Sequence, residues 1–207
     1  MLTIGAKRGY CGSVYFINNT QLISTNSFTD LGIDTDNALS YHNHIANIVS
    51  KASQRVGILF RGFMTRDLKF MQKAFITYIR PLLEYNSCVW NPHQKKYIYL
   101  LENVQRRFTK RIPSLRELSY SERLTMLNLE PLELRRLKTD LLEYYKIFHN
   151  LNAIDCSAHF NFYEPITSTR SSSPKLIKPA KGNNTVMFSF LIEPSTAGIT
   201  YPTTCVL

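Results

Sequence analysis

The fold is decided by residues 92–151, which read PHQKKYIYLLENVQRRFTKRIPSLRELSYSERLTMLNLEPLELRRLKTDLLEYYKIFHNL. Two long amphipathic helical patterns flank a short one in this stretch. In the first pattern, Tyr97, Leu101, Val104 and Phe108 recur at steps of four, three and four residues, which places them on one face of a helix. This face is expected to pack against neighbouring helices.

The remainder of the same stretch predicts two further helices. Ile112-Pro113 ends the first pattern, and Ser119 followed by Glu122 fits a capping box that begins a short helix, which ends near Leu127. Pro131 suits the first turn of a long last helix that ends near Asn152. The predicted inward stripe of this last helix consists of Leu134, Leu137, Leu141, Tyr145 and Phe148.

Two more helices are predicted upstream. One spans about Ser40–Phe63, and the other spans about Arg66–Glu84 with a kink at Pro81, which lacks a backbone donor. Trp90 is interpreted as a core anchor rather than a platform for base stacking. The predicted inward residues are Ile45, Ile48, Ala52, Val56, Leu59 and Phe63 in the first helix, and Met71, Phe75, Ile79 and Leu82 in the second.

Strand patterns precede the helices. Met1–Gly5 is a short apolar run, Val14–Ile17 and Gln21–Ser24 flank an Asn-Asn turn as a hairpin, and Phe28–Ile33 favours a further strand. After Asp155, recurrent proline and a Ser/Thr-rich run predict an extended or disordered tail. The expected fold is therefore mainly α: N-terminal strands over residues 1–36, a helical bundle over 37–155 and a tail over 156–207.

The charge of the chain is strongly positive and unevenly distributed. The net charge is +10, and residues 93–111 contain six Lys or Arg residues against one acid, Glu102. Residues 51–80 contain seven against Asp67 alone. Basic helices of this kind can lie along a phosphate backbone, although a solvated helix face with no partner is the plain alternative.

Other classes of protein have little support in the sequence. No run of about 18 apolar residues could span a bilayer, and no signal segment opens the chain, so an intracellular protein of the nucleus or cytoplasm is expected. Cys11, Cys88, Cys156 and Cys205 form no CxxC pair and are interpreted as reduced thiols. His42 and His44 project to different helix faces, which favours surface or capping roles over a shared metal.

Several phrases of the sequence, taken in order, resemble one family. They run from the first residues to about Lys178, and the chain resembles the region that follows the polymerase palm in non-LTR (LINE-type) retrotransposon reverse transcriptases. The phrases are Thr29-Asp-Leu-Gly-Ile33, Lys51-Ala52, Ile79-Arg-Pro-Leu-Leu-Glu-Tyr85, Val89-Trp-Asn-Pro92, Val104-Gln-Arg-Arg-Phe-Thr-Lys-Arg-Ile112, Leu118-Ser-Tyr-Ser-Glu-Arg-Leu124, Leu134-Arg-Arg-Leu-Lys-Thr-Asp-Leu141 and Tyr145-Lys-Ile147.

This resemblance implies the end of the palm, the thumb and the helices after it, with an inherited role in holding an RNA template and a DNA primer. An intramolecular salt bridge, for example to Glu102, Glu133 or Asp140, is the alternative role for each cation, and it is favoured for Arg136 with Asp140. The residues expected to contact the nucleic-acid backbone are Arg106, Arg107, Lys110, Arg111, Arg135, Arg136, Lys138, Lys51 and Arg55.

The catalytic part of such an enzyme is not recognisable in this chain. The family holds its Mg²⁺ ions partly through a Tyr-x-Asp-Asp motif, and no Asp-Asp pair occurs in the sequence. Asp34 and Asp36 are interpreted as the end of a strand. We therefore predict no polymerase activity and no bound cofactor for this chain by itself.

Two alternatives and one hypothesis about the tail remain. The chain could instead be a helical module that docks a protein, or a translated remnant of a decayed mobile element without function. In the family, a phenylalanine-serine pair precedes a Trp-Asn-x-Leu-Pro phrase, which is absent after Phe188-Ser189. The codons for Leu191–Pro202 permit that phrase in a shifted frame, which suggests that residues 190–207 are frameshifted.

Overall fold

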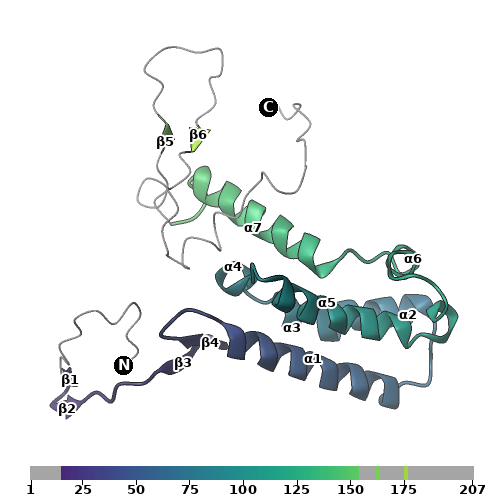
Figure 1. Ribbon diagram of the computed structural model, residues 1–207, viewed down its shortest axis with the longest axis horizontal. Helices are drawn as coiled ribbons and strands as arrows, with labels where there is room; N and C mark the ends of the chain where they lie inside the picture. Colours follow the sequence, from purple (N-terminus) through teal and green to yellow (C-terminus); the bar gives the residue numbers. More distant parts are fainter. Residues whose placement is uncertain (1–14, 154–161, 164–174, 177–207) are drawn as a thin grey trace.

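The computed structural model describes residues 15–153, 162–163 and 175–176, and most of them lie in helices (Figure 1). The prediction of a mainly helical fold with small strands near the N-terminus is confirmed. The run Met1–Gly5 and residues 190–207, for which a frameshift was suggested, lie outside the described residues. Within the predicted tail, β5 (Phe162–Tyr163) and β6 (Lys175–Leu176) form a short antiparallel pair.

The first hairpin has the predicted Asn-Asn turn. β1 (Phe16–Ile17) pairs antiparallel with β2 (Thr20–Gln21). Asn18 and Asn19 connect the strands with φ angles of 47° and 60°. Two successive positive φ angles characterise the turn whose twist matches a β-hairpin, and asparagine tolerates them well.

A second hairpin replaces the single strand predicted over residues 28–33. β3 (Ser27–Asp30) pairs antiparallel with β4 (Ile33–Asp36). Leu31 and Gly32 form the turn between them, with φ angles of 47° and 82°. The prediction was wrong because the chain reverses at Leu31 and Gly32, within the predicted strand, through positive φ angles that glycine adopts easily.

Helix α1 (His42–Gly62) follows the hairpins and supplies one side of the core. Its predicted inward residues are buried from Ile45 to Leu59, but Phe63 is 44% exposed and Phe60 is buried instead. The reason is that α1 ends at Gly62, so Phe63 has an extended backbone and leaves the helix face.

The second predicted helix is divided into three parts. It comprises α2 (Leu68–Ala74), the π-helical turn η1 (Phe75–Ile79) and α3 (Arg80–Glu84). The π-helical turn contains one additional residue, which rotates the following turn and buries Leu83 rather than the predicted Leu82. The irregularity lies immediately before Pro81, where the missing backbone donor weakens regular helix.

Helices α4 (Ser87–Trp90) and α5 (Lys95–Lys110) complete the centre of the core. Trp90 is buried and donates its indole N–H to the carbonyl of Tyr85 at 2.9 Å, which agrees with the predicted anchor role. In α5, Leu101, Val104 and Phe108 are buried as predicted. Tyr97, at the start of their stripe, is half-buried against the core.

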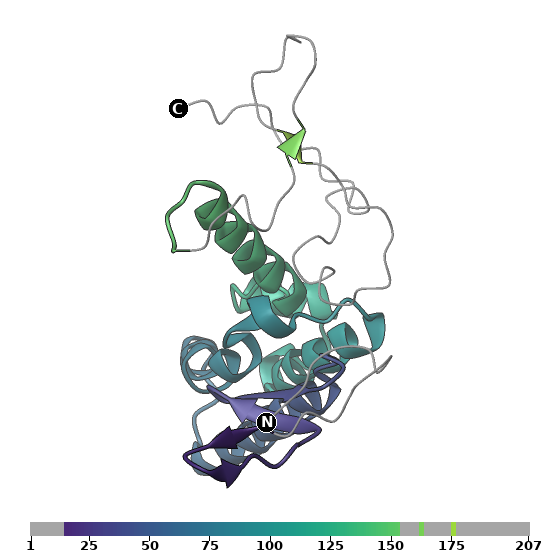
Figure 2. The same cartoon turned by 90° about the vertical axis from the view of Figure 1, so that its left-hand side faces the viewer.

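The last two helices differ in length, and the longer one packs against the other helices along only part of its surface. After the 3-10 turn η2 (Pro113–Leu115), α6 (Tyr120–Met126) begins with the predicted capping box, in which the Ser119 and Glu122 side chains each bond the backbone of the other. Helix α7 (Leu132–Phe148) extends away from the other helices (Figure 2).

The inward stripe predicted for α7 is wrong. Leu134, Leu141 and Tyr145 are exposed, whereas Leu132, Arg136 and Ile147 are buried. The helix packs through a face whose central residue is an arginine, and hydrophobic periodicity cannot identify such a face.

Candidate nucleic-acid interface

Helices α1 and α5 run parallel to each other. At their N-terminal ends, the rings of His42 and Tyr97 stack with centroids 4.6 Å apart. Near their C-terminal ends, Phe60 and Phe108 meet edge to face at 5.5 Å. The two C-terminal ends therefore lie side by side, and their exposed carbonyl groups favour cations at this end of the body.

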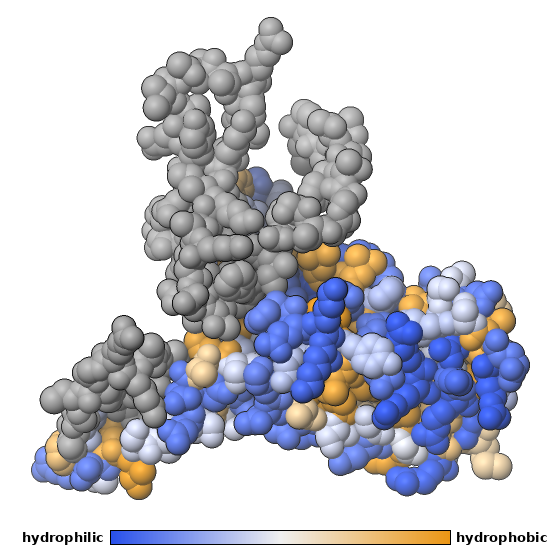
Figure 3. Space-filling model, viewed as in Figure 1, coloured by the Kyte–Doolittle hydropathy of each residue, from blue (hydrophilic) through white to orange (hydrophobic). Residues whose placement is uncertain are grey.

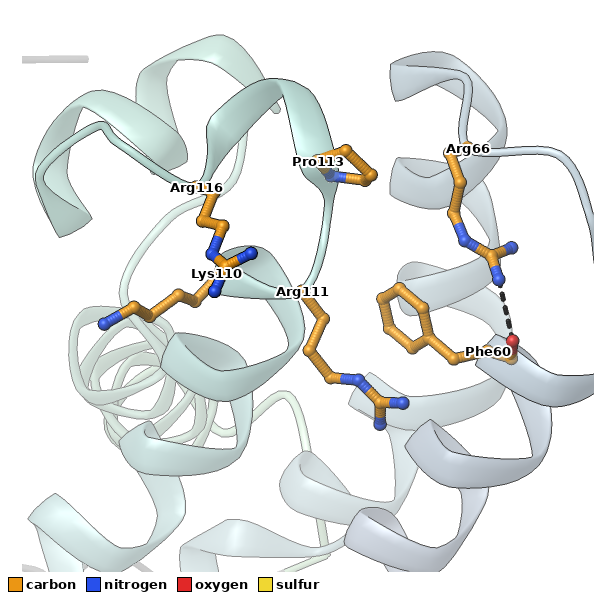
Figure 4. Close-up of a pocket in the computed structure, with 6 residues that line it drawn as sticks. All are labelled: Phe60, Arg66, Lys110, Arg111, Pro113 and Arg116. Carbon is orange, nitrogen blue, oxygen red and sulfur yellow. Dashed lines mark hydrogen bonds between the residues drawn. The ribbon is translucent and has the colours of Figure 1, made fainter.

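A pocket of about 640 Å³ opens at these helix ends (Figure 4). Four of its six lining side chains are cationic and come from three separate segments: the loop after α1, the end of α5 and the residue after η2. Its lining residues are Phe60, Arg66, Lys110, Arg111, Pro113 and Arg116.

Phe60 holds two of the cations in place. The guanidinium carbon of Arg111 lies 4.4 Å from the centre of the Phe60 ring, and that of Arg66 lies 5.1 Å from it. Figure 4 shows the ring between these two side chains. Phe60 therefore helps to hold both guanidinium groups in position.

Arg66 also caps helix α1. Its guanidinium donates to the carbonyl oxygens of Phe60 at 2.7 Å and Thr65 at 3.1 Å, and to that of Phe63. These bonds satisfy carbonyl groups at and after the helix end. Arg66 therefore offsets the negative end of the α1 dipole, and the other three cations of the pocket are left to act on a ligand.

A second pocket of about 350 Å³ adjoins the first along the same helix pair. It is lined by Ser53, Val56, Val104 and Arg107 and shares Lys110 and Arg111 with the first pocket. We call the two pockets together the basic groove. Figure 3 shows hydrophilic side chains gathered over the half of the body where α1 and α5 end.

The basic groove contains cations without acidic partners. No acidic side chain is among the described residues that line either pocket. Nor does any ion pair between described residues involve its five cations. These cations are Arg66, Arg107, Lys110, Arg111 and Arg116. Apart from Arg66, which is bonded to carbonyl groups, these cations are therefore available to an anionic partner.

Arg106 was predicted to contact the nucleic-acid backbone, but its side chain lies against Tyr120 and does not line the basic groove. Its guanidinium carbon lies 4.1 Å from the centre of the Tyr120 ring, and its buried Nε has no hydrogen-bond partner among the described residues. The Tyr120 hydroxyl donates a hydrogen bond to Glu102. The pKa of Tyr120 is raised mainly by burial and, to a smaller extent, by this neighbouring carboxylate. Arg106 thus covers a structural network between α5 and α6.

The same network reaches α7. Glu102 is 7% exposed, and its second carboxylate oxygen accepts the backbone N–H of Leu132 at 2.9 Å. The Gln105 amide donates to the Tyr120 hydroxyl at 3.1 Å and to the Glu130 carbonyl at 3.0 Å. A carboxylate at the start of α7 also suits the positive end of its dipole.

Arg135 and Lys138, which were also expected to contact a nucleic acid, form ion pairs within the chain. Arg135 makes a bidentate pair with Glu84, at 2.5 and 3.0 Å, and Lys138 pairs with Glu130. These partners differ from the Glu102, Glu133 and Asp140 that were considered from the sequence. The carboxylates already take up much of the hydrogen-bonding capacity of Arg135 and Lys138, so both are poorly placed for phosphate.

The expectation that Arg136 contacts a nucleic acid is contradicted by its burial, because this side chain is only 1% exposed. Its Nε donates to Asn91 at 3.2 Å, and the Asn91 amide donates to Asp140 at 2.5 Å, so the expected pair with Asp140 is bridged by Asn91. Burial lowers the pKa of Arg136 and raises that of Asp140. A nucleic-acid backbone cannot reach this side chain while α7 is packed.

Lys51 and Arg55 are exposed on α1 but do not line the basic groove. Arg55 donates to the Tyr78 carbonyl at 3.1 Å. Sequence reasoning missed two residues that do line it, Arg66 and Arg116. Arg66 belongs to the basic run over residues 51–80. Arg116 follows Pro113 outside any cluster of basic residues, so its position in the sequence did not indicate a binding role.

The titratable side chains of Asp34, His44 and Cys88 lie outside the basic groove. Asp34 accepts hydrogen bonds from Thr29 and Asn47, both at 2.7 Å, and these bonds lower its pKa. The Nδ1 of buried His44 accepts the backbone N–H of Asp34 at 3.3 Å. Cys88 is a free thiol whose pKa burial raises to about 11. Among the described residues, no group of His, Cys, Asp and Glu could hold a metal ion.

Comparison with known proteins finds one distant similarity. No family model and no solved structure matches the chain. It is similar to the uncharacterized protein B0403.1 of Caenorhabditis elegans, with 27% identity over 134 residues. The match covers 63% of this chain and 66% of that relative. In the part of the chain that the structure describes, no helix combines the length and apolar character needed to cross a membrane.

Proposed function

We propose that this chain binds the phosphate backbone of a nucleic acid in the basic groove, as the template- and primer-holding part of a non-LTR reverse transcriptase. The observation that carries the proposal is the convergence of five cations on one groove, with no acidic side chain among the described residues that line it. Guanidinium groups suit phosphate oxygens because they donate two parallel hydrogen bonds. Binding of this kind has little sequence preference.

The packing of the family-like phrases supports the same proposal. The Tyr85 hydroxyl donates to the Leu31 carbonyl at 3.3 Å, which joins two phrases that are far apart in the sequence. Arg135 pairs with Glu84, and Asn91 bonds to Asp140, which adds two more phrases, those at residues 134–141 and 89–92. Such contacts are expected if the phrases are retained because they maintain a common fold. The resemblance to the family would then reflect a shared three-dimensional architecture.

The proposed role is that of a holder and not of a catalyst. Polymerisation requires acidic side chains that position divalent ions. In this proposal, those side chains belong to a palm encoded upstream. Purified chain is expected to show no primer extension with Mg²⁺ and nucleotides.

Fluorescence anisotropy with a labelled single-stranded oligonucleotide tests the binding site. The double variant Arg107→Ala/Lys110→Ala removes two exposed cations of the basic groove and is expected to weaken binding about tenfold or more. Lys73→Ala, an exposed cation on α2 outside the groove, is the matched control and is expected to change affinity little. Equal losses from both variants would refute the groove as the site.

A second candidate function is protein docking through α7. Its exposed face contains Leu134, Leu141, Leu142 and Tyr145, an apolar surface larger than a holder of phosphate needs. Contacts of this kind bury apolar area, so binding through them is expected to tolerate rising salt, whereas phosphate binding weakens steeply.

A further inference from the structure

The solvent face of α5, a helix that lies wholly within the described residues, is positive and contains one tyrosine. The acid of this helix, Glu102, is 7% exposed and is bonded to Tyr120 and Leu132. Arg107 and Lys110 also line the basic groove, so this face begins where the groove ends. The exposed residues of α5 are Lys95, Lys96, Tyr99, Arg107 and Lys110.

Helix stability does not account for this distribution of charge. Lys95 and Lys96 lie in the first turn of α5, where the helix dipole disfavours cations, and this turn contains no acid. Arg106 and Lys110 are four residues apart, and like charges at this spacing destabilise a helix slightly. No ion pair between described residues involves a cation of α5. An anionic partner explains these charges better.

Tyr99 lies within this positive face. On a regular helix, Lys96, Tyr99, Arg107 and Lys110 fall within about 80° of one another around the axis. Tyr99 precedes Arg107 by two helical turns, a distance of about 12 Å along the axis. A strand bound by the cations of the basic groove can therefore pass over Tyr99 if it continues along α5.

A neighbouring cation limits the orientation of the Tyr99 ring. The guanidinium carbon of Arg106 lies 6.0 Å from the centre of the Tyr99 ring and 4.1 Å from that of the Tyr120 ring. Tyr99 is nevertheless 61% exposed. Its ring is therefore accessible and partly ordered, which reduces the entropy that a ligand must overcome to fix it.

An exposed aromatic ring beside phosphate-binding cations suits an unpaired nucleobase. Proteins that bind single strands combine cations for the backbone with aromatic side chains for the bases. In a duplex, neighbouring bases cover most base faces, whereas an unpaired base can present its face to a side chain. A protein partner is favoured less, because an apolar surface does not surround Tyr99 on this helix face.

From this arrangement, we infer that Tyr99 stacks on an unpaired base of the strand whose phosphates the basic groove binds. The inference rests on the proposed function and makes it more specific, because it names unpaired nucleic acid as the ligand and Tyr99 as the residue that contacts the base. Every base has an aromatic face, so the contact distinguishes a base from no base and carries little sequence preference.

Fluorescence anisotropy with two labelled strands of equal length tests this inference. One strand is an oligothymidylate, and the other has the same sugar-phosphate backbone without bases. Because both strands have the same number of phosphates, the groove cations can bind both, and the ratio of affinities reports the contribution of the bases. We expect the oligothymidylate to bind about tenfold more tightly, which is typical of one base stacked on an aromatic side chain.

Variants of Tyr99 locate the effect. Tyr99→Ala is expected to reduce the preference below about threefold, whereas Tyr99→Phe keeps the ring and is expected to preserve it. Neither variant removes a cation, so the dependence of affinity on salt should not change. Tyr145→Ala, on α7, removes a tyrosine that is similarly exposed, at 53%, and is the control that should leave the preference unchanged.

Three results would overturn the inference and leave the proposed function in place. The first is equal affinity of the parent chain for both strands, and the second is a preference that survives Tyr99→Ala. The third is a weaker salt dependence in Tyr99→Ala, which would show that the ring acts only by positioning charge. Absence of binding to either strand would refute the proposed function, and the inference with it.

Discussion

Glu102 is the residue whose removal should most strongly destabilise the fold. Its two carboxylate oxygens accept from the Tyr120 hydroxyl and the Leu132 N–H, and it is 7% exposed. Glu102→Ala leaves both donors without their partner, at about 1–3 kcal/mol each, so the expected loss is about 2–6 kcal/mol in the free energy of unfolding. Because a typical domain has about 5–15 kcal/mol in total, the variant is expected to be marginal at 37 °C.

Urea unfolding followed by circular dichroism measures this loss. Glu102→Gln keeps one acceptor oxygen and is expected to lose about half as much stability as the alanine variant. Glu117→Ala, an exposed acid nearby, is the control and should remain within about 0.5 kcal/mol of the parent. A loss below about 1 kcal/mol for Glu102→Ala would refute the conclusion that this carboxylate connects α5, α6 and α7.

Three further predictions concern other parts of the fold. A double-mutant cycle on Arg135 and Glu84, which are 31% and 21% exposed, should give a coupling of about 0.5–1 kcal/mol; zero coupling would show that the pair contributes nothing. Gly32→Ala should lower stability by about 1 kcal/mol, because the φ angle of 82° strains any residue with a Cβ, and an unchanged melting temperature would contradict this. Burial lowers the pKa of His44, so the native state holds it neutral while the unfolded chain takes up a proton below about pH 6.5. Stability should therefore fall as pH decreases from about 6.5 to the lowered native pKa, and His44→Asn, compared by thermal unfolding at several pH values, should remove that part of the fall.

Much of the helical core could be predicted from the sequence because its apolar residues are regularly spaced. Leu101, Val104 and Phe108 are buried as the spacing indicated, and the Ser119 capping box forms as predicted. Periodicity failed where the backbone departs from an ideal helix. The π-helical turn before Pro81 moved burial from Leu82 to Leu83, and no propensity indicates such a turn.

The candidate site was only partly predictable, for an electrostatic reason. A cation in a sequence can serve a ligand or a nearby acid, and the choice depends on residues brought close only by folding. Arg135 meets Glu84, 51 residues away, and Arg136 is buried beside Asn91. Arg107, by contrast, forms no ion pair with any described acid and lines the basic groove.

The family-like phrases illustrate the same point. Arg106 and Arg135 belong to the phrases on which the proposed relation to reverse transcriptases rests, yet the Arg106 side chain stacks on Tyr120 and that of Arg135 pairs with Glu84. Arg116, which lies outside those phrases, lines the end of the groove. Arg107, Lys110 and Arg111 belong to one of these phrases and also line the groove, so membership of a phrase does not by itself separate a structural cation from one that is free to bind a ligand.

The salt dependence of binding to a single-stranded oligonucleotide tests the central claim most directly. Four cations of the basic groove are available to phosphate: Arg107, Lys110, Arg111 and Arg116. If each neutralises one phosphate, the logarithm of the association constant should fall with the logarithm of salt concentration with a slope of about −3, and Arg107→Ala/Lys110→Ala should reduce its magnitude by about 1.4. A slope shallower than about −1, or one that the double variant leaves unchanged, would contradict the account.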